Sequence, residues 1–253
     1  MLAIIGGTGL TQLENLNVKS RKVVRTPYGE PSSPIVLGEL GGKTVAFLAR
    51  HGGGHTIPPH MVNYRANIWA LKSVGVCDIV AVATVGGIHA DLGPSVIALP
   101  NQLIDYTHGR LHTFHDGLSA DANLAAVRHI DFTHPYNERL RMLCLSAAKA
   151  NHVKIVDGGV YGCVQGPRLE TAAEINRLER DGATMVGMTG MPEAALAREL
   201  DMAYTAICPI ANHAAGRGSS SDGIAFEQIG IVLAETMHHV RKLLAGVLTQ
   251  YGN

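Results

Sequence analysis

Four glycine-rich segments of this chain place polar side chains directly after apolar runs. In the first, IIGGTGL, Thr8 stands among glycines whose backbone N–H groups can approach an anion closely. In the second, ARHGGGH, Arg50, His51 and His55 surround three glycines. A guanidinium offers a planar fork of donors that suits a phosphate dianion. Together these segments predict an oxyanion site, although a tight turn explains the first segment equally well when it is taken alone.

The other two segments carry groups that suit a sugar and a heterocycle. The third segment is VYGCVQGPRLETAAE together with GATMVGMTGMPEAALAREL, which follows it closely. In its first part, Glu170 follows a Gly-Pro turn at the expected start of a helix, where it could face a cleft or simply cap the helix. In its second part, Met188 and Thr189 lie between a strand and a helix, near an anion-binding amino end. In the fourth segment, YTAICPIANHAAG, Asn212 ends a strand, and its amide can read two edges of a heterocycle at once.

The elements that would position these segments alternate along the chain. Apolar runs joined by amphipathic helices favour an α/β fold, with a largely parallel or mixed sheet covered by helices and ligands beyond the strand ends. No internal repeat or low-complexity linker divides the chain, so we expect one domain over residues 1–253. The expected strands are 2–5, 44–49, 78–85, 95–99, 155–163, 184–188 and 203–210. The expected helices are 60–73, 135–151, 170–181, 192–200 and 225–249.

Composition narrows the classes of partner. The 253 residues are 46% hydrophobic, which allows a sizeable core, and 21 basic residues balance 21 acidic ones. A balanced charge and only 5% aromatic residues argue against nucleic acid or an anionic membrane as partner. The apolar runs are too short to span a bilayer, and the opening MLAIIGGTG lacks the features of a signal peptide. Four cysteines without paired spacing predict reduced core thiols in a cytoplasmic protein.

Two other classes of function compete with an oxyanion-dependent enzyme. His108, His112 and His115 cluster in sequence and could indicate a metal-dependent hydrolase. No H-E-x-x-H motif or cysteine pair accompanies them, so we interpret them as solvated loop histidines and predict no metal site. A non-catalytic nucleotide-binding module would hold a nucleoside without consuming it, and phosphate dependence would distinguish it from an enzyme.

Taken together, the four segments resemble the trimeric purine nucleoside phosphorylases, in particular their methylthioadenosine phosphorylase branch. The similarity covers nearly the whole chain and is carried by RHGGGHTIPPHMVNYRANIWALKSVG, QGPR and GMTGMPEAALARE. The resemblance implies a twisted mixed β-sheet surrounded by helices. It also implies a homotrimer with sites near subunit contacts, close to which His129 would lie. Inorganic phosphate would be a co-substrate, and no separate cofactor is implied.

The resemblance further assigns roles by position. The residues expected on the phosphate side are Thr8, Arg50, His51, His55, Thr84 (through its backbone) and Thr189. Those expected around the nucleoside are Leu169, Glu170, Met188, Asn212, His213 and Ala214. Of these, Arg50, Thr189 and Asn212 are expected to be catalytic.

Two positions favour a 6-oxopurine base. Adenine-specific members of the family carry serine and aspartate where this chain has Glu170 and Asn212, whereas members that accept hypoxanthine and guanine carry Glu and Asn. A carboxylate accepts from the ring N–H of a 6-oxopurine, while the bare lone pair of adenine would repel it. Unpaired buried groups penalise the wrong base strongly. Leu169 replaces a family phenylalanine, which removes some base stacking.

The sugar end differs from that of enzymes which bind a free 5′-hydroxyl. Those enzymes place a histidine roughly a dozen residues after the Asn, whereas this chain has Ile224, Ala225 and Phe226. An apolar wall suits a methylthio group. The combination predicts S-methyl-5′-thioinosine as the substrate, and the chain is similar to the bacterial methylthioinosine phosphorylases. Methylthioadenosine is the first alternative, followed by inosine or guanosine.

Overall fold

The first strand, β1 (Leu2–Gly6), is buried along its whole length. In the computed structural model, which describes residues 1–117 and 122–252, alternate side chains of β1 enter two different cores. Leu2 and Ile4 pack with one set of helices, whereas Ala3 and Ile5 pack with another. A strand that is apolar on both faces must be covered on both faces, so β1 lies in the middle layer of a three-layer fold.

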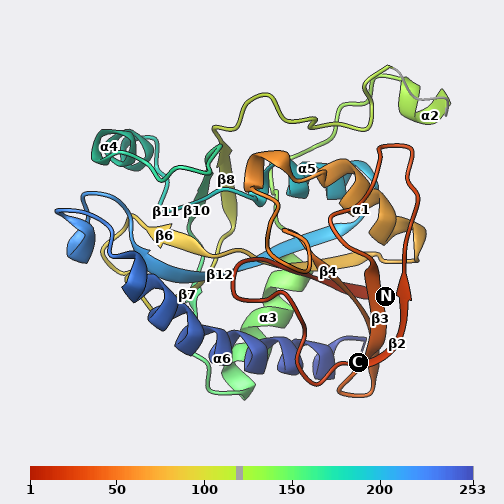
Figure 1. Cartoon of the computed structure of the whole chain (residues 1–253), viewed down its shortest axis with the longest axis horizontal. Coiled ribbons are helices and arrows are strands. Elements are labelled where there is room, and N and C mark those ends of the chain that lie inside the picture. Colours follow the sequence, from red (N-terminus) through yellow and green to blue (C-terminus); the bar gives the residue numbers. More distant parts are fainter. Residues whose placement is uncertain (118–121, 253) are drawn as a thin grey trace.

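Twelve strands of the described ranges form one mixed sheet (Figure 1). Its order is β2-β3-β4-β1-β5-β12-β6-β11-β10-β8, with β7 and β9 attached beside β12. The central strands β4, β1, β5 and β12 run parallel, whereas β2, β3 and the β6–β11 pair are antiparallel to a neighbour. The remaining bounds are β2 (Asn17–Lys22), β3 (Ile35–Leu40), β4 (Lys43–Ala49), β5 (Asp78–Val82), β6 (Val85–Gly87), β7 (Ile97–Leu99), β8 (Gln102–Asp105), β9 (Val156–Asp157), β10 (Val160–Cys163), β11 (Met185–Gly187) and β12 (Ala203–His213).

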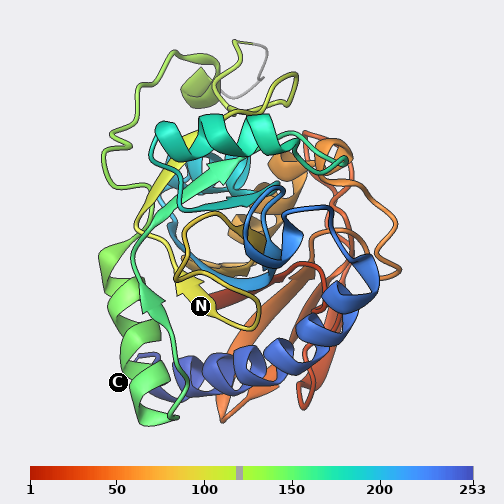
Figure 2. The same ribbon diagram turned by 90° about the vertical axis from the view of Figure 1, so that its left-hand side faces the viewer.

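Helices cover both faces of this sheet. In Figure 1, α1 and α5 lie above the sheet and α3 and α6 below it. Figure 2 shows α6 running along the underside with α3 beside it, while α4 lies at the opposite end of the molecule. The helices are α1 (Tyr64–Ser73), α2 (Ala122–Ala125), α3 (Glu138–Ala150), α4 (Ala172–Arg180), α5 (Gly190–Glu199) and α6 (Phe226–Gln250), with short 3-10 turns η1 (Pro59–Met61) and η2 (Gly218–Ser220). The predicted α/β fold with a mixed, helix-covered sheet is confirmed.

Two expected strands are each divided in the structure. The stretch 78–85 separates into β5, which ends at Val82, and β6, which begins at Val85. The Ala83 N–H donates to the Ile207 carbonyl of β12 and makes the last hydrogen bond of the β5–β12 ladder. The stretch 155–163 separates into β9 and β10 at Gly158 and Gly159, which both adopt positive φ. The first division matters for function because it leaves Ala83 and Thr84 outside both strands.

Sequence analysis missed β2, β3 and β8. The strand β3 has the sequence IVLGEL and is largely buried, so its apolar pattern was present in the chain and was overlooked. The other two strands lack an apolar run. β2 has the sequence NVKSRK, is exposed throughout and pairs only with β3, so no core contact marks it. The polar-edged strand β8 is only partly buried. Edge strands with little core contact carry little hydrophobic pattern, which explains why both escaped prediction.

The four cysteines are free, but they do not all lie in the core. Cys144, Cys163 and Cys208 are buried, whereas Cys77 is exposed, so the prediction of a core thiol is wrong for Cys77. It follows α1 and immediately precedes β5, where the chain passes the surface. None of the helices in the described ranges has both the length and the apolar character that crossing a bilayer requires.

Candidate active site

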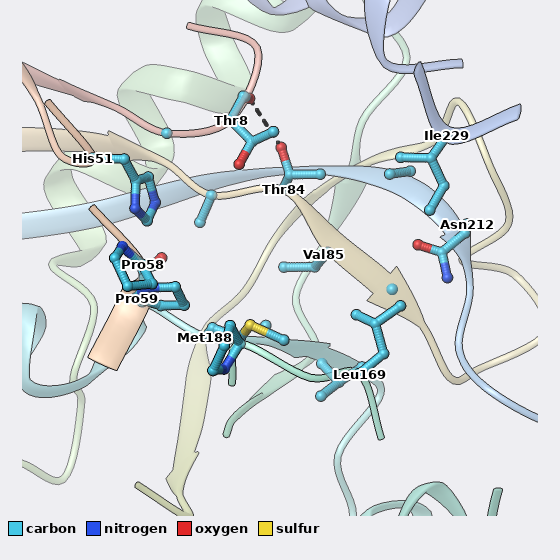
Figure 3. Close-up of a pocket in the computed structure, with 18 of the residues that line it drawn as sticks. Thr8, His51, Pro58, Pro59, Thr84, Val85, Leu169, Met188, Asn212 and Ile229 are labelled. Atoms are coloured by element: carbon cyan, nitrogen blue, oxygen red, sulfur yellow. Dashed lines mark hydrogen bonds between the residues drawn. The ribbon is translucent and has the colours of Figure 1, made fainter. Parts of the chain in front are cut away.

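A cavity of about 480 Å³ opens where neighbouring parallel strands end. Since β4, β1 and β5 run side by side in one direction, the residues after them meet at one edge of the sheet. All predicted site residues except His213 line this cavity: Thr8, Arg50, His51, His55, Thr84, Leu169, Glu170, Met188, Thr189, Asn212 and Ala214. Figure 3 shows Thr8, Thr84 and His51 on one side of the cavity and Asn212 and Leu169 on the other, with Met188 along the lower edge near Pro59.

Arg50 is fully buried at the floor of the cavity. Its Nε and Nη2 each donate to one carboxylate oxygen of Glu193 at 2.7 Å, and Nη1 donates to the Val82 carbonyl at 2.9 Å. Burial alone lowers the pKa of Arg50, but the charge and hydrogen bonds of Glu193 outweigh it and raise that pKa above its ordinary value. Three of the five guanidinium N–H donors are therefore occupied, which leaves two for a ligand.

Glu193 is the functional residue that sequence reasoning missed. It lies in the first turn of α5, is fully buried, and also accepts a 2.9 Å hydrogen bond from the Tyr204 hydroxyl. Because Glu193 already balances the charge of Arg50, the guanidinium offers an incoming anion directed N–H groups rather than a free positive charge. A clue was present in the sequence: a carboxylate in the apolar stretch GMPEAALARE needs a buried cationic partner.

The first glycine segment is a close-approach turn. A Cβ atom on Gly7 would lie 2.6 Å from the Val82 carbonyl oxygen and 2.9 Å from Arg50 Nη1, so only glycine fits there. The Thr84 hydroxyl donates to the Thr8 carbonyl at 3.1 Å and fastens this turn to the β5–β6 break (Figure 3). Both threonines are thereby held beside Arg50 at one end of the cavity.

The two cavity histidines differ in environment. His51 is buried, and its Nδ1–H donates to the Ile57 carbonyl at 2.8 Å. Burial, together with the charge of Arg50, lowers the pKa of His51 to about 4. At neutral pH its Nε2 is therefore a hydrogen-bond acceptor. His55 is exposed, with its Nε2 lying 3.4 Å from the Thr8 hydroxyl and its ring 4.9 Å from that of His51.

Thr189 directly precedes α5 and lines the same cavity as Arg50. Its backbone N–H donates to the buried Tyr161 hydroxyl at 3.3 Å, and its side chain makes no capping hydrogen bond to the helix. Because Met191 has non-helical dihedral angles, the regular part of α5 begins after it, and the helix dipole does not end at Thr189. The Thr189 hydroxyl is not used as a helix cap and can donate to an anion in the cavity.

At the opposite end of the cavity, Asn212 is aimed by a β-bulge. The register between β12 and β6 shifts between Ile210 and Asn212, and bulges re-aim side chains in this way. The Asn212 Nδ2 donates to the His213 carbonyl at 2.6 Å, so one N–H and the Oδ1 are left for a ligand.

Glu170 is not a helix cap. The helix α4 begins at Ala172 and is capped by Thr171 and Glu174, which form a reciprocal capping box. Glu170 therefore precedes the helix, is half-buried and lines the cavity. Burial is the main cause that raises the pKa of its carboxyl above the usual range. An acceptor group is thus held near Asn212 in a partly dry environment.

His213 points away from the cavity. A Cβ added to Gly93 or to Gly218 would meet its ring, and its Nδ1 accepts from the Ser219 backbone N–H at 3.3 Å. Neighbouring residues of a strand face opposite sides, so Asn212 and His213 cannot both face the same pocket. The His213 side chain packs between the loop that contains Gly93 and the loop that contains Gly218, outside the cavity.

An apolar wall closes the third side. Ile224, Phe226 and Ile229 line the cavity next to Asn212. The helix α6 begins at Phe226 without a side-chain cap, and Phe226 remains 71% exposed although it lines the cavity. The polar groups of the opposite end are absent from this wall, so it suits an apolar substituent.

The histidines considered as metal ligands are engaged elsewhere. His112 Nδ1 lies 3.2 Å from the Arg110 carbonyl, and His115 Nδ1 lies 3.0 Å from the Ala126 carbonyl. Within the two described ranges, no group of three or more His, Cys, Asp or Glu side chains is arranged to hold a metal ion.

Comparison with known proteins agrees with this geometry. The model of the family described as the phosphorylase superfamily matches residues 1–249. A probable S-methyl-5′-thioinosine phosphorylase from Pseudomonas syringae pv. tomato is 53% identical over 247 residues, covering 98% of either chain. A 6-oxopurine nucleoside phosphorylase from Pyrococcus furiosus is 45% identical over 85% of this chain and 80% of its own. The solved methylthioadenosine phosphorylase from Schistosoma mansoni with adenine superposes with a TM-score of 0.91 at 30% identity, over 99% of this chain and 91% of that one.

Proposed function

Because this chain belongs to the phosphorylase superfamily, we propose that it uses inorganic phosphate to cleave the glycosidic bond of a purine nucleoside. One observation carries the proposal: a single cavity is lined both by groups that suit an oxyanion, Arg50 and Thr189, and by groups that suit a heterocycle, Glu170 and Asn212. Met188 also lines this cavity, where it would pack against the sugar. A nucleoside that spans the two sets of groups has its anomeric carbon facing the oxyanion.

The chemistry follows from these positions. Phosphate held by Arg50, the threonine hydroxyls and backbone N–H groups faces the sugar as its bond to the base stretches. The sugar gains oxocarbenium character, which the anion stabilises. The departing purine gains negative charge, which the N–H of Asn212 offsets. Fixed dipoles of this kind supply a large part of enzymatic rate enhancement, and positioning supplies much of the rest. No covalent enzyme intermediate is required.

The base end favours a 6-oxopurine. The Glu170 carboxylate is free of capping duty and accepts from the ring N–H, while the Asn212 amide donates to the keto oxygen. The relatives named above support this choice, since two of them are named for 6-oxopurine or thioinosine substrates.

The sugar end favours a methylthio group. Ile224, Phe226 and Ile229 provide an apolar surface where a hydroxyl would have no partner. The proposed reaction is S-methyl-5′-thioinosine plus phosphate giving hypoxanthine and 5-methylthioribose 1-phosphate. Methylthioadenosine is the second candidate, because the solved Schistosoma mansoni enzyme shares the fold.

Competition between substrates tests this proposal directly. Methylthioinosine, methylthioadenosine and inosine are offered together with phosphate, and the released bases and sugar phosphates are quantified. We expect hypoxanthine and methylthioribose 1-phosphate to dominate, and no base to be released without phosphate. Base release that is independent of phosphate, or binding without turnover, would contradict a phosphorylase. Sensitivity to a chelator would favour the metal-dependent alternative.

Assembly as a homotrimer and a cytoplasmic role in purine salvage are further parts of the proposal. Their support is the family resemblance and the exposed position of His129, which would be free to approach a neighbouring subunit. Light scattering coupled to size exclusion measures the assembly directly. A monomer that retains full activity would contradict a trimeric requirement.

A further inference from the structure

Arg110 is a second buried arginine, located in the loop after β8 and only 9% exposed. Its Nη1 donates to the Met188 carbonyl at 2.8 Å and to the Met191 carbonyl at 2.6 Å. Its Nη2 donates to the Gln165 carbonyl at 2.9 Å, and its Nε donates to the Gln165 side chain at 3.2 Å. One guanidinium thus joins two chain segments that are far apart in sequence.

These two segments form different walls of the active-site cavity. Met188, with Thr189, belongs to the wall that faces phosphate and sugar, whereas Gln165 leads through Pro167 into the wall that carries Glu170. The guanidinium itself does not line the cavity. Its position behind both walls allows it to set the separation between them.

A third wall is attached to the same guanidinium. Arg110 Nη1 lies 3.3 Å from the Tyr64 hydroxyl, which donates to the Pro59 carbonyl at 2.9 Å. Pro58 and Pro59 line the cavity beside His51 (Figure 3). Arg110 therefore contacts, directly or through Tyr64, segments that belong to three sides of the cavity.

Arg110 differs from Arg50 in its partners. Among the ion pairs of residues 1–117 and 122–252, none involves Arg110, whereas Arg50 is paired with Glu193. A buried cation that is held by carbonyl oxygens has a fixed geometry, because several rigid acceptors must be met at once by one planar group. The peptide between Met188 and Thr189 is held from both sides, since its carbonyl accepts from Arg110 and its N–H donates to Tyr161.

We propose that Arg110 is a positioning residue for phosphorolysis, which holds the phosphate–sugar wall and the base wall at the separation that one nucleoside spans. The proposal rests on the function proposed above. Lysine cannot replace Arg110, because a compact ammonium has no planar fork to reach carbonyls on both segments.

The test compares Arg110→Ala with Arg110→Lys. We expect each to lower kcat/KM for the nucleoside, by about 100-fold for the alanine variant, because a small misplacement of reacting groups has effects of this size. The KM for phosphate and the KM for nucleoside should both rise. Millimolar methylguanidinium should restore at least part of the activity of Arg110→Ala, whereas methylammonium should not.

Arg198→Ala is the matched control. Arg198 also donates to two loop carbonyls, those of Asp131 and His134, at 2.9 and 2.7 Å, but it lies outside the cavity. We expect its kcat and both KM values to stay within about twofold of the wild type, since changes away from the site are usually small.

Two results would overturn the positioning role. One is an Arg110→Lys enzyme with wild-type kcat and both KM values. The other is an Arg110→Ala enzyme that loses thermal stability alone, with unchanged kinetics and no response to methylguanidinium. If the wild type phosphorolyses no purine nucleoside, the proposed function fails instead. In that case the thermal shift caused by hypoxanthine and by phosphate still measures whether Arg110 shapes the cavity.

Discussion

The two ends of the cavity are built in opposite ways. Around the proposed phosphate position, Arg50, Glu193 and Thr189 are buried. Arg50 directly follows β4, and Thr189 lies shortly after β11. At the sugar end, Phe226 is exposed and stands at the uncapped start of a long helix. The difference indicates that buried residues hold the reacting groups in a fixed geometry. The exposed residues at the sugar end can change, and alter the choice of substrate, without disturbing the core.

Glu193→Gln should have the largest effect, because it removes the charge that balances Arg50. Breaking a buried ion pair by changing one partner destabilises by about 3–5 kcal/mol. We therefore expect a lower melting temperature and a loss in kcat/KM of more than about 100-fold. The KM for phosphate should rise, because Arg50 loses the bidentate carboxylate that orients its remaining N–H donors. Phosphate-saturation kinetics and calorimetry measure both effects.

Glu199→Gln is the control for this prediction. Glu199 is buried in the same helix and accepts from Thr113 and Phe114 instead of from a cavity residue. It should lose stability while its KM for phosphate remains near the wild-type value. Equal kinetic losses in the two variants would contradict a special role for Glu193.

Asn212→Asp should change the choice of base by about 10–100-fold, since one hydrogen-bonding partner is exchanged in a site that reads polar groups. A protonated aspartic acid can donate to the purine imidazole nitrogen and accept from a 6-amino group. The ratio of thioinosine to thioadenosine rates should move toward the 6-amino substrate. An unchanged ratio would refute the assignment of Asn212 to the base.

Ile224→His should have a smaller effect, confined to the sugar. An added polar group favours a free 5′-hydroxyl over a methylthio group by about tenfold, because single changes in an apolar pocket alter selectivity by about 1–3 kcal/mol. The ratio of kcat/KM for inosine and methylthioinosine measures this change. Ile231→His, in the nearby helix α6 but outside the cavity, should leave the ratio unchanged.

The last prediction concerns the dependence of stability on pH, and it leaves the kinetics at neutral pH unchanged. The pKa of His51 is about 4 in the fold and 6.5 in its usual surroundings, so the unfolded chain binds a proton that the folded chain does not. His51 therefore contributes stability above pH 6.5 that is lost as pH falls toward 4, at about 1.4 kcal/mol per pH unit.

Denaturant unfolding at pH 7 and pH 5 checks this prediction. The loss between the two pH values should be smaller in His51→Asn than in the wild type. The exposed His238 provides the control, and His238→Asn should lose stability with pH as the wild type does. Parallel curves for wild type and His51→Asn would show that His51 titrates normally.

Sequence patterns located the elements that have strong core contact. The apolar runs of β1, β4 and β12 and the amphipathic patterns of α3 and α6 are visible in the chain, and all five elements lie within a few residues of their expected bounds. The strands β2 and β8 were missed because hydrogen bonding to a neighbouring strand holds them in place and leaves no periodic pattern. The strand β3 was missed although its apolar run, IVL, is visible in the sequence.

For the site, the sequence by itself determined which groups stand at the ends of strands, among them Arg50, Thr189 and Asn212. The parallel strands β4 and β1 bring their carboxyl ends to one edge, so Arg50 and Thr8 must meet. Thr189 follows β11, which runs antiparallel to β6, so strand direction alone does not place it there. Only the tertiary structure decided that Glu193 balances Arg50, that His51 is buried and neutral, that His213 faces away, and that Arg110 joins separate walls. Each of these depends on which side chains from distant segments pack together, and local sequence carries no record of a partner that folding brings from elsewhere in the chain.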